Sequence, residues 1–412
     1  MANLNLVKTI QENRNLACHY SNYNWFLAGS FLAETGDWLN RMALNWFVFT
    51  LTDSPFYVGL VEFCRMIPIM LFTLPGGVAG DKWDRRKVIM VTQIGALLTT
   101  LVLAFVIYLG VNSIGYLAGF ILLYGIFLAF EIPVRNALIP NILPKPAITS
   151  GLSFFSAALN ISRMIGPGIA GLLLASWSIP TVVFLNVICF AGSIAALMMV
   201  GPVHPRAETG NQLKFGPGIK ETVTYFKDHS IVLCLFGLGI VPMVFGFSYT
   251  TLMPVFATEV LHAGPEGFGL LLSCSALGAV ITSLALGWGK YPLSKGWLFS
   301  GGIAAFGGGL ILFSYSAFYP FALFLMFLVG MVSQGYRIIE RVVIQETIPD
   351  HLRGRILSVV MMDSGFIPLG NLLVGFLGET IGAIAALRFM GTVCVITVFL
   401  VILMNRRILA IR

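Results

Sequence analysis

The stretch Gly76–Lys87, which reads GGVAGDKWDRRK, decides how the rest of the chain is interpreted. It follows the apolar run Phe56–Ala79 and precedes the apolar run Val88–Gly110, and each run is long enough to cross a bilayer. Four of its last six residues are cations, which must stay in water. Because cytoplasmic loops of membrane proteins carry the excess of Lys and Arg, we predict that this loop is cytoplasmic and that both neighbours span the membrane.

The composition supports the same class of protein. Of the 412 residues, 57% are hydrophobic and 10% are charged, a balance that no soluble core could bury. With roughly 30 to 35 residues for each span and its connection, the length predicts about 12 transmembrane helices. The net charge of +7 does not indicate a nucleic-acid partner, because the cations gather in loops on one predicted side. An even number of spans with both termini cytoplasmic explains this asymmetry.

The apolar runs and the polar stretches between them predict an all-α membrane protein with two six-helix halves. The first 24 residues are polar and contain no apolar core of a signal peptide. We expect the chain to divide into a cytoplasmic segment 1–24, a first half 25–200, a linker 201–230, a second half 231–405 and a cytoplasmic tail 406–412. The expected helices are 25–49, 57–79, 87–110, 113–133, 149–175, 180–200, 232–257, 267–289, 297–316, 319–340, 354–378 and 382–404.

Two internal echoes indicate that the halves are pseudo-repeats around a central cavity. The segment Gly80–Arg86 matches Gly289–Lys295 at the equivalent place in the second half. The other echo pairs, at a constant offset, Ile139, Pro144, Leu152 and Ser153 with Ile344, Pro349, Leu357 and Ser358.

Three motifs resemble those of the major facilitator superfamily. The pattern Gly77-x-x-x-Asp81-Lys82-x-Asp84-Arg85-Arg86 is similar to its signature between helices 2 and 3, with Asp84 where many members have Gly. The segments Gly36–Arg41 and Glu131–Asn136 resemble the bacterial branch of enterobactin and macrolide exporters. The segment Ser162–Gly171 is similar to the antiporter signature, with Ser162 and Ala170 in place of glycines. The resemblance covers essentially the full chain and implies the twelve-helix major facilitator fold in a bacterial inner membrane.

Charged residues inside the predicted spans are the candidates for a substrate and proton cavity, because an ionised side chain at mid-bilayer costs roughly 2.5 to 3.5 kcal/mol. Glu34, Asp37 and Arg41 lie at helical spacing on one face. The alternative to a functional role is a structural pair between Asp37 and Arg41 at i,i+4. Glu62 and Arg65, at i,i+3, allow the same alternative.

Arg163 and Asp363 have no opposite charge within a turn of their own helices, so we expect their partners elsewhere. Arg163 suits an anionic group of the substrate, because a guanidinium stays charged and binds oxyanions in a fork. Asp363 is either a second titrating site or the counter-ion of such an arginine.

The resemblance also implies a cytoplasmic gate that includes Gly77 and Arg86. In it Asp81 accepts hydrogen bonds from backbone amides of a facing helix, and Arg85 forms a charge cluster with Glu131 and Arg135. The alternative is that the cations of this loop only set topology. In the antiporter-like motif, Gly166, Pro167 and Gly171 predict a kinked helix packed closely across the interface between halves, although such residues are common in spanning helices.

The remaining residue types exclude other chemistry. No histidine lies in a predicted span, the six cysteines are scattered, and no nucleotide-binding loop occurs, so we expect no metal, no cofactor, no ATP hydrolysis and no enzyme. Coupling would then use carboxylates and the proton gradient.

We therefore predict a secondary transporter that exports a siderophore or amphipathic drug by proton antiport and alternating access. A proton-coupled importer and a lysolipid or lipid flippase are the alternatives. The expected partners are the bilayer, the small-molecule substrate and protons, with no nucleic acid and no obligate protein partner, which makes the chain a monomer.

Overall fold

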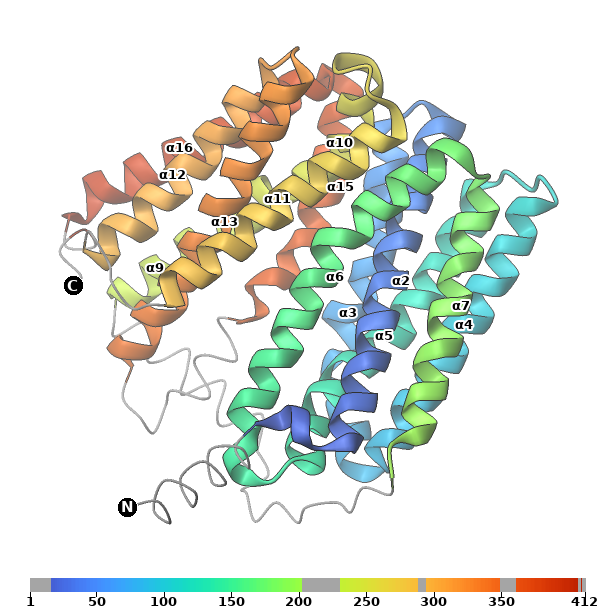
Figure 1. The fold of residues 1–412 in the computed structure, drawn as a ribbon. Helices are drawn as coiled ribbons and strands as arrows, with labels where there is room; N and C mark the ends of the chain where they lie inside the picture. The colour runs from blue at the N-terminus through green and yellow to red at the C-terminus, as the bar shows by residue number, and fades with distance from the viewer. Residues whose placement is uncertain (1–15, 202–229, 288–293, 349–360, 407–408, 410–412) are drawn as a thin grey trace, which may run out of the picture. The chain divides into compact units, whose positions relative to one another are not determined.

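The computed structural model describes residues 16–201, 230–287, 294–348, 361–406 and 409, and the regular structure of this part is entirely helical (Figure 1). The prediction of an all-α fold is thereby confirmed for these residues. The chain divides into two compact units: one within Met1–Phe47 and Cys64–Glu208, the other within Val48–Phe63 and Thr209–Arg412. The division after Glu208 falls within the predicted linker 201–230, most of which lies outside the described residues.

The first unit contains α4 to α7 and most of α2 and α3. Its long helices are α2 (Ser21–Thr52), α3 (Pro55–Lys82), α4 (Arg85–Tyr108), α5 (Ile114–Ile142), α6 (Ile148–Ser176) and α7 (Ile179–Met199). Single 3₁₀ turns, η1 (Ala17–His19) and η2 (Lys145–Ala147), precede α2 and α6. Within this unit α4 packs against both α5 and α7 (Figure 1).

In the second unit α13 packs against α11 and α12, and α12 packs against α16 (Figure 1). Its α-helices are α9 (Ser230–Val241), α10 (Met253–Val255), α11 (Gly264–Gly287), α12 (Lys295–Ser314), α13 (Tyr319–Thr347), α15 (Ile367–Ile381) and α16 (Ala383–Met404). Its short turns of other helix types are η3 (Pro242–Gly246), η4 (Phe247–Leu252), η5 (Phe256–Val260) and η6 (Met361–Phe366).

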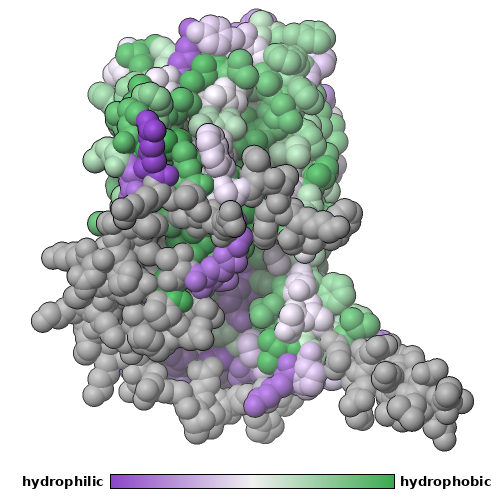
Figure 2. All heavy atoms as spheres, turned by 90° about the vertical axis from the view of Figure 1, so that its left-hand side faces the viewer, coloured by the Kyte–Doolittle hydropathy of each residue, from purple (hydrophilic) through white to green (hydrophobic). Residues whose placement is uncertain are grey.

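The two faces of helix α4 indicate that this chain is surrounded by lipid and not by water. Its outer face is apolar and exposed at Val91, Leu98 and Phe105. Its inner face buries the polar residues Thr92, Gln93, Thr99 and Thr100. This is the reverse of a helix in a soluble protein, and it is what a bilayer requires. Figure 2 shows apolar side chains over most of the described surface in the upper part of one face.

Eleven helical stretches in the described residues are long and apolar enough to cross a membrane, so the chain is a multi-pass membrane protein. Helix α2 is not among the eleven, although it has 32 residues. It carries three of the predicted cavity charges, Glu34, Asp37 and Arg41.

Two expected helices differ from the structure for reasons connected with proline. Helix α5 was expected to end at residue 133 but continues through Pro133 and Pro140 to Ile142. Membrane helices tolerate proline, because neighbouring groups satisfy the freed backbone carbonyls. The expected helix 232–257 is instead a series of short α, π and 3₁₀ segments, in which Pro242 and Pro254 supply no amide for a regular ladder.

The repeat prediction has one counterpart in the described residues. Helices α5 and α13 both have 29 residues, and Ile139 and Ile344 lie at equivalent places in them. The second copies Pro349, Leu357 and Ser358, and most of Gly289–Lys295, lie outside the described residues. The pseudo-repeat therefore stays a prediction.

Candidate functional site

Asp37, which is half-buried, is the centre of a charge cluster in the first unit. Its carboxylate forms an ion pair with Arg65 of α3. The same oxygen accepts a hydrogen bond of 2.5 Å from the hydroxyl of Tyr124 on α5. The guanidinium of Arg65 in turn lies over the Tyr124 ring, 5.0 Å from its centroid. The sequence offered Arg41 and Glu62 as same-helix partners, whereas the fold brings Asp37 and Arg65 together from adjacent helices.

A second ion-pair group joins α2 to α5, α4 and α7. Arg135 lies 3.2 Å from the carboxylate of Glu34 and 3.6 Å from that of Glu131, whose side chain is only 2% exposed. The amide of Gln93 donates to Glu131 over 3.1 Å, and the hydroxyl of Ser193 donates to Gln93 over 3.0 Å. The result is a continuous polar network from α2 to α7 inside an apolar helical bundle.

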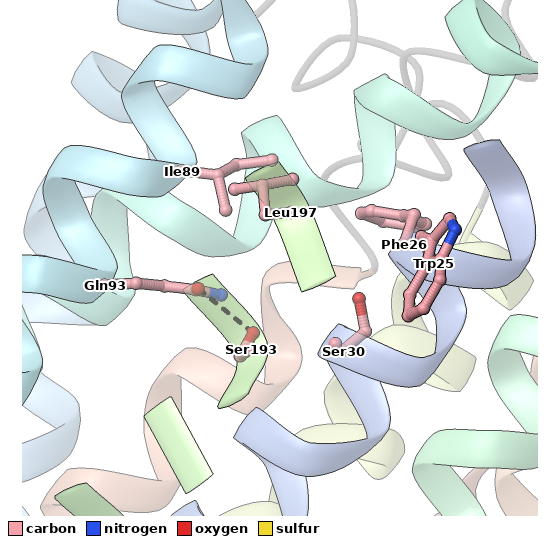
Figure 3. Close-up of a pocket in the computed structure, with 8 residues that line it drawn as sticks. Trp25, Phe26, Ser30, Ile89, Gln93, Ser193 and Leu197 are labelled. Carbon is pink, nitrogen blue, oxygen red and sulfur yellow. Dashed lines mark hydrogen bonds between the residues drawn. The ribbon is translucent and has the colours of Figure 1, made fainter. Parts of the chain in front are cut away.

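The network ends at a small cleft in the first unit (Figure 3). There Gln93 of α4 and Ser193 of α7 point toward one another. Trp25 is 43% exposed, so the cleft lies at the surface of the unit. The residues that line it are Trp25, Phe26, Gly29, Ser30, Ile89, Gln93, Ser193 and Leu197. The buried carboxylate Glu131 is therefore connected to this surface through two hydrogen-bonded side chains.

Trp38 forms a third feature with two arginines. The guanidinium of Arg41 lies 5.1 Å from the centre of its ring, and that of Arg163 lies 5.8 Å away. The indole N–H is buried and has no acceptor among the described residues. Two cations, an aromatic face and an unused donor together are suited to an anionic group.

The second unit holds its own charged group on one face of α13. Asp363, in η6, is buried and accepts a hydrogen bond of 2.5 Å from the backbone amide of Ser364. Its charged neighbours are Arg337 and Arg341, and Asp363 itself neighbours Glu340. Arg337 and Glu340 lie inside the expected helix 319–340 but were not singled out there, and Arg341 lies one residue beyond it. Their i, i+3, i+4 spacing in a helix that continues to Thr347 is the signal that could have found them.

The hinge arginines hold helix ends. Arg85 donates to the carbonyl of Ala137 over 2.7 Å, near the end of α5. Arg86 donates to the carbonyls of Leu197 and Met198, at 3.1 and 2.8 Å, at the end of α7. Both place a positive charge near the C-terminal end of a helix, where the helix dipole is negative.

The predicted cluster of Arg85 with Glu131 and Arg135 is not what the structure shows. The two α5 residues belong to the network with Glu34, whereas Arg85 lies at the end of that helix. The carboxylate of Asp81 is 71% exposed and lies 3.2 Å from Arg85. Among the hinge carboxylates it is Asp84 that accepts from backbone amides, two of them in the first turn of α4. Asp84 is thus the N-cap of α4, which explains why this chain has Asp where many members of the superfamily have Gly.

The antiporter-like motif packs α6 against α2 within the first unit. A Cβ on Gly166 would lie 2.6 Å from the Cβ of Trp38, so only glycine permits this approach. Ser162 donates a hydrogen bond to the backbone of α2, and Pro167 and Gly171 are buried beside it. The predicted close packing is present in this motif, and the neighbour is α2 of the same unit.

The glycines of the hinge motif differ in how close their neighbours are. A Cβ on Gly76 would lie 2.8 Å from the backbone of Phe130, and one on Gly80 would lie 2.8 Å from Val134. Beside Gly77 there is no atom within 4 Å. Gly76 and Gly80, a small-xxx-small pair, therefore allow the contact between α3 and α5. In the described residues, no group of His, Cys, Asp and Glu could hold a metal ion.

Apolar helices that bury ion pairs on their inner faces are typical of a multi-pass membrane protein with a pathway for substrates, ions or protons. The chain matches the family described as transmembrane secretion effector over residues 18–410, and it belongs to this family of the major facilitator superfamily. It is therefore a secondary transporter of small molecules and not an enzyme.

Curated relatives cover nearly the whole chain. A staphyloferrin A transporter of Staphylococcus aureus is 33% identical over 390 residues, which are 93% of this chain and 96% of the relative. The multidrug efflux pump Tap of Mycobacterium tuberculosis is 26% identical over 86% of this chain and 87% of its own length. Among solved structures, the nucleoside transporter NupG has a TM-score of 0.76 at 16% identity, with 93% of this chain and 98% of that chain covered. This last similarity shows the fold alone.

Proposed function

We propose that the chain crosses a bacterial inner membrane twelve times and exports a small organic molecule in exchange for protons. Helix α2 would be the twelfth span, since its 32 residues are more than the roughly 20 that a bilayer needs. Its charges need not face lipid, because Glu34 and Asp37 are paired inside the first unit. An even number of spans, with the hinge arginines inside the cell, would place both termini in the cytoplasm.

The Asp37 cluster is the observation that carries this proposal. A structural role would be met by one ion pair, yet α2 places two carboxylates among Arg65, Tyr124 and Arg135. Ionisable groups are rare in spanning helices and mark pathways of substrates, ions or protons. Charges with alternative partners on several helices can change partner as helices move, as alternating access requires.

The substrate class follows from the Trp38 site and from the relatives. Arg41 and Arg163 beside the indole ring suit an anionic group attached to a ring-bearing molecule. The named relatives are a staphyloferrin A transporter, a multidrug efflux pump and, at 22% identity, a macrolide efflux protein of Streptococcus pyogenes. The substrates in these names are compatible with the Trp38 site. We therefore infer that the substrate is a siderophore or an amphipathic drug.

The first experiment compares the small molecules in iron-starved medium of the source bacterium with and without the chain. We expect a chelator to disappear from the medium and to accumulate in cells that lack the chain. If the medium is unchanged, siderophore export is wrong, and accumulation of drugs and lysolipids becomes the next comparison. If the chelator accumulates less inside deletion cells, the chain is an importer.

Asp37→Asn and Arg163→Ala are each expected to abolish export, because the first removes the charge that Arg65 holds and the second removes a cation beside Trp38. Asp53→Asn is the matched control for the first variant. Asp53 is exposed, and its φ of 52° is one that asparagine adopts well. Lys82→Ala, in the exposed hinge, is the control for the second. Wild-type export in both site variants, at equal expression, contradicts the assignment of the site.

A further inference from the structure

Glu340 is a buried carboxylate that the site in the first unit does not use. It lies on α13 of the second unit and is 2% exposed. Its Oε1 atom fills the space beside Gly239 of α9, where a Cβ would come within 2.0 Å of it. The absence of a side chain at this point of α9 is what leaves room for the carboxylate.

The partners of Glu340 differ from those of the carboxylates in the first unit. Glu34, Asp37 and Glu131 each form an ion pair with an arginine. In the part of the chain that the structure describes, Glu340 forms no ion pair, and its Oε1 atom has no hydrogen-bond partner. The hydroxyl of Tyr336, one turn earlier on α13, is also buried and has no partner there.

The charged and titratable surroundings of Glu340 come from few elements. On α13 they are Arg337, Arg341 and Tyr336, and on η6 the neighbouring group is Asp363. Asp363 has the same charge as an ionised Glu340 and so opposes that charge. Described residues of α9, the helix that packs on the carboxylate, include no charged side chain. A neutral carboxylic acid meets this environment better than an anion does, because an unpaired buried charge is strongly disfavoured.

We propose that Glu340 is a proton-binding site of this chain. Its role in transport rests on the proposed function: Glu340 is the site at which the proton exchanged for substrate is taken up and released. The proton adds to a carboxylate oxygen when the site is closed to water. It leaves when a movement of α13 against α9 opens the site to water or brings Arg337 or Arg341 against the oxygen, because a nearby guanidinium favours the ionised form.

The test is an infrared titration of the purified full chain in lipid bilayers, since a protonated carboxyl absorbs apart from an ionised one. With the pH varied from about 5 to about 9, the wild type is expected to lose a protonated-carboxyl band as the pH rises. Glu340→Gln is expected to lack that band, and Glu340→Asp to retain one at a shifted frequency. Glu346→Gln, on the same helix but exposed and paired with Lys295, is the control and is expected to retain the wild-type band.

A band that persists unchanged in Glu340→Gln overturns the inference, as does a wild type with no protonated carboxyl at any pH in the range. If Glu340→Gln does not fold, Glu340→Asp decides: an unshifted band shows that it belongs to another residue. The titration needs no substrate. A band assigned to Glu340 therefore supports proton binding even if deletion of the chain leaves the medium unchanged. An unchanged medium would refute only the proposed export.

Discussion

Replacing Arg135 with methionine tests whether the network from α2 to α7 is held by buried charge. Methionine retains an apolar stem beside Phe155, so the main change is the loss of the guanidinium. Glu131 then keeps only the hydrogen bond from Gln93, and Glu34 loses its ion pair. An anion is left inside the bundle without a counter-charge.

The magnitude follows from the separations. At an effective dielectric constant of about 20, a pair of unit charges 3.6 Å apart, as in Arg135 and Glu131, attracts by about 4 to 5 kcal/mol. Glu34 is more exposed, so its pair adds less. Removing one partner of a buried pair costs about 3 to 5 kcal/mol, and we expect Arg135→Met to lose this much stability. At about 2 °C per kcal/mol, the apparent Tm falls by about 6 to 10 °C.

The six free cysteines provide the assay, because five of them are buried or half-buried and react with a thiol dye when the chain unfolds. The double variant Arg135→Met with Glu131→Gln removes both buried charges and is expected to recover most of the loss. Lys82→Met, in the exposed hinge, should stay within about 0.5 kcal/mol of wild type. A single variant as stable as wild type, or a double variant less stable than the single, refutes the buried-charge explanation.

Two further substitutions test helix contacts with the same assay. Gly166→Val forces a side chain into the 2.6 Å approach to Trp38 and should cost about 1 to 3 kcal/mol, whereas Gly77→Val, with open space beside it, should not; equal effects would contradict the packing of α6 on α2. Arg85→Ala removes the charged hydrogen bonds to the Ala137 carbonyl and to the side chain of Asn141 and should cost about 1 to 3 kcal/mol, partly recovered in Arg85→Lys; no loss would mean that the hinge cations set topology only.

The membrane class and most helices could be predicted because they depend on quantities that are local in sequence. A run of about 20 apolar residues is visible without any tertiary contact, and so is a loop dense in cations. The polar stripe of α2 was visible for the same reason, because helical spacing alone places Glu34 and Asp37 on one face. Both residues form ion pairs within the first unit, Glu34 with Arg135 and Asp37 with Arg65.

The partners of these charges could not be predicted, because they depend on which helices pack together. Spacing offers only partners within one helix, whereas Asp37 is held by Arg65 of α3 and Tyr124 of α5. Glu131 was placed in the gate by the family resemblance, and its helix was expected to end at residue 133. Since α5 continues to Ile142, that carboxylate lies more than two turns inside the helix. Tyr124 had no signal of its own, since an aromatic residue in an apolar helix is ordinarily filler.

The carboxylates of the two units suit different tasks. A carboxylate held by an arginine, such as Glu34 or Asp37, has a counter-charge within the first unit, so it can fix a helix or change partner as helices move. A buried carboxylate without an ion pair, such as Glu340, gains or loses charge when its surroundings change. If both properties are needed in one transport cycle, substrate and proton need not compete for the same side chain. Substrate transport and proton transport would then be coupled by the helix movement that changes the partners of both kinds of carboxylate. A variant at Glu340 should therefore change the pH dependence of transport more than it changes the affinity for substrate.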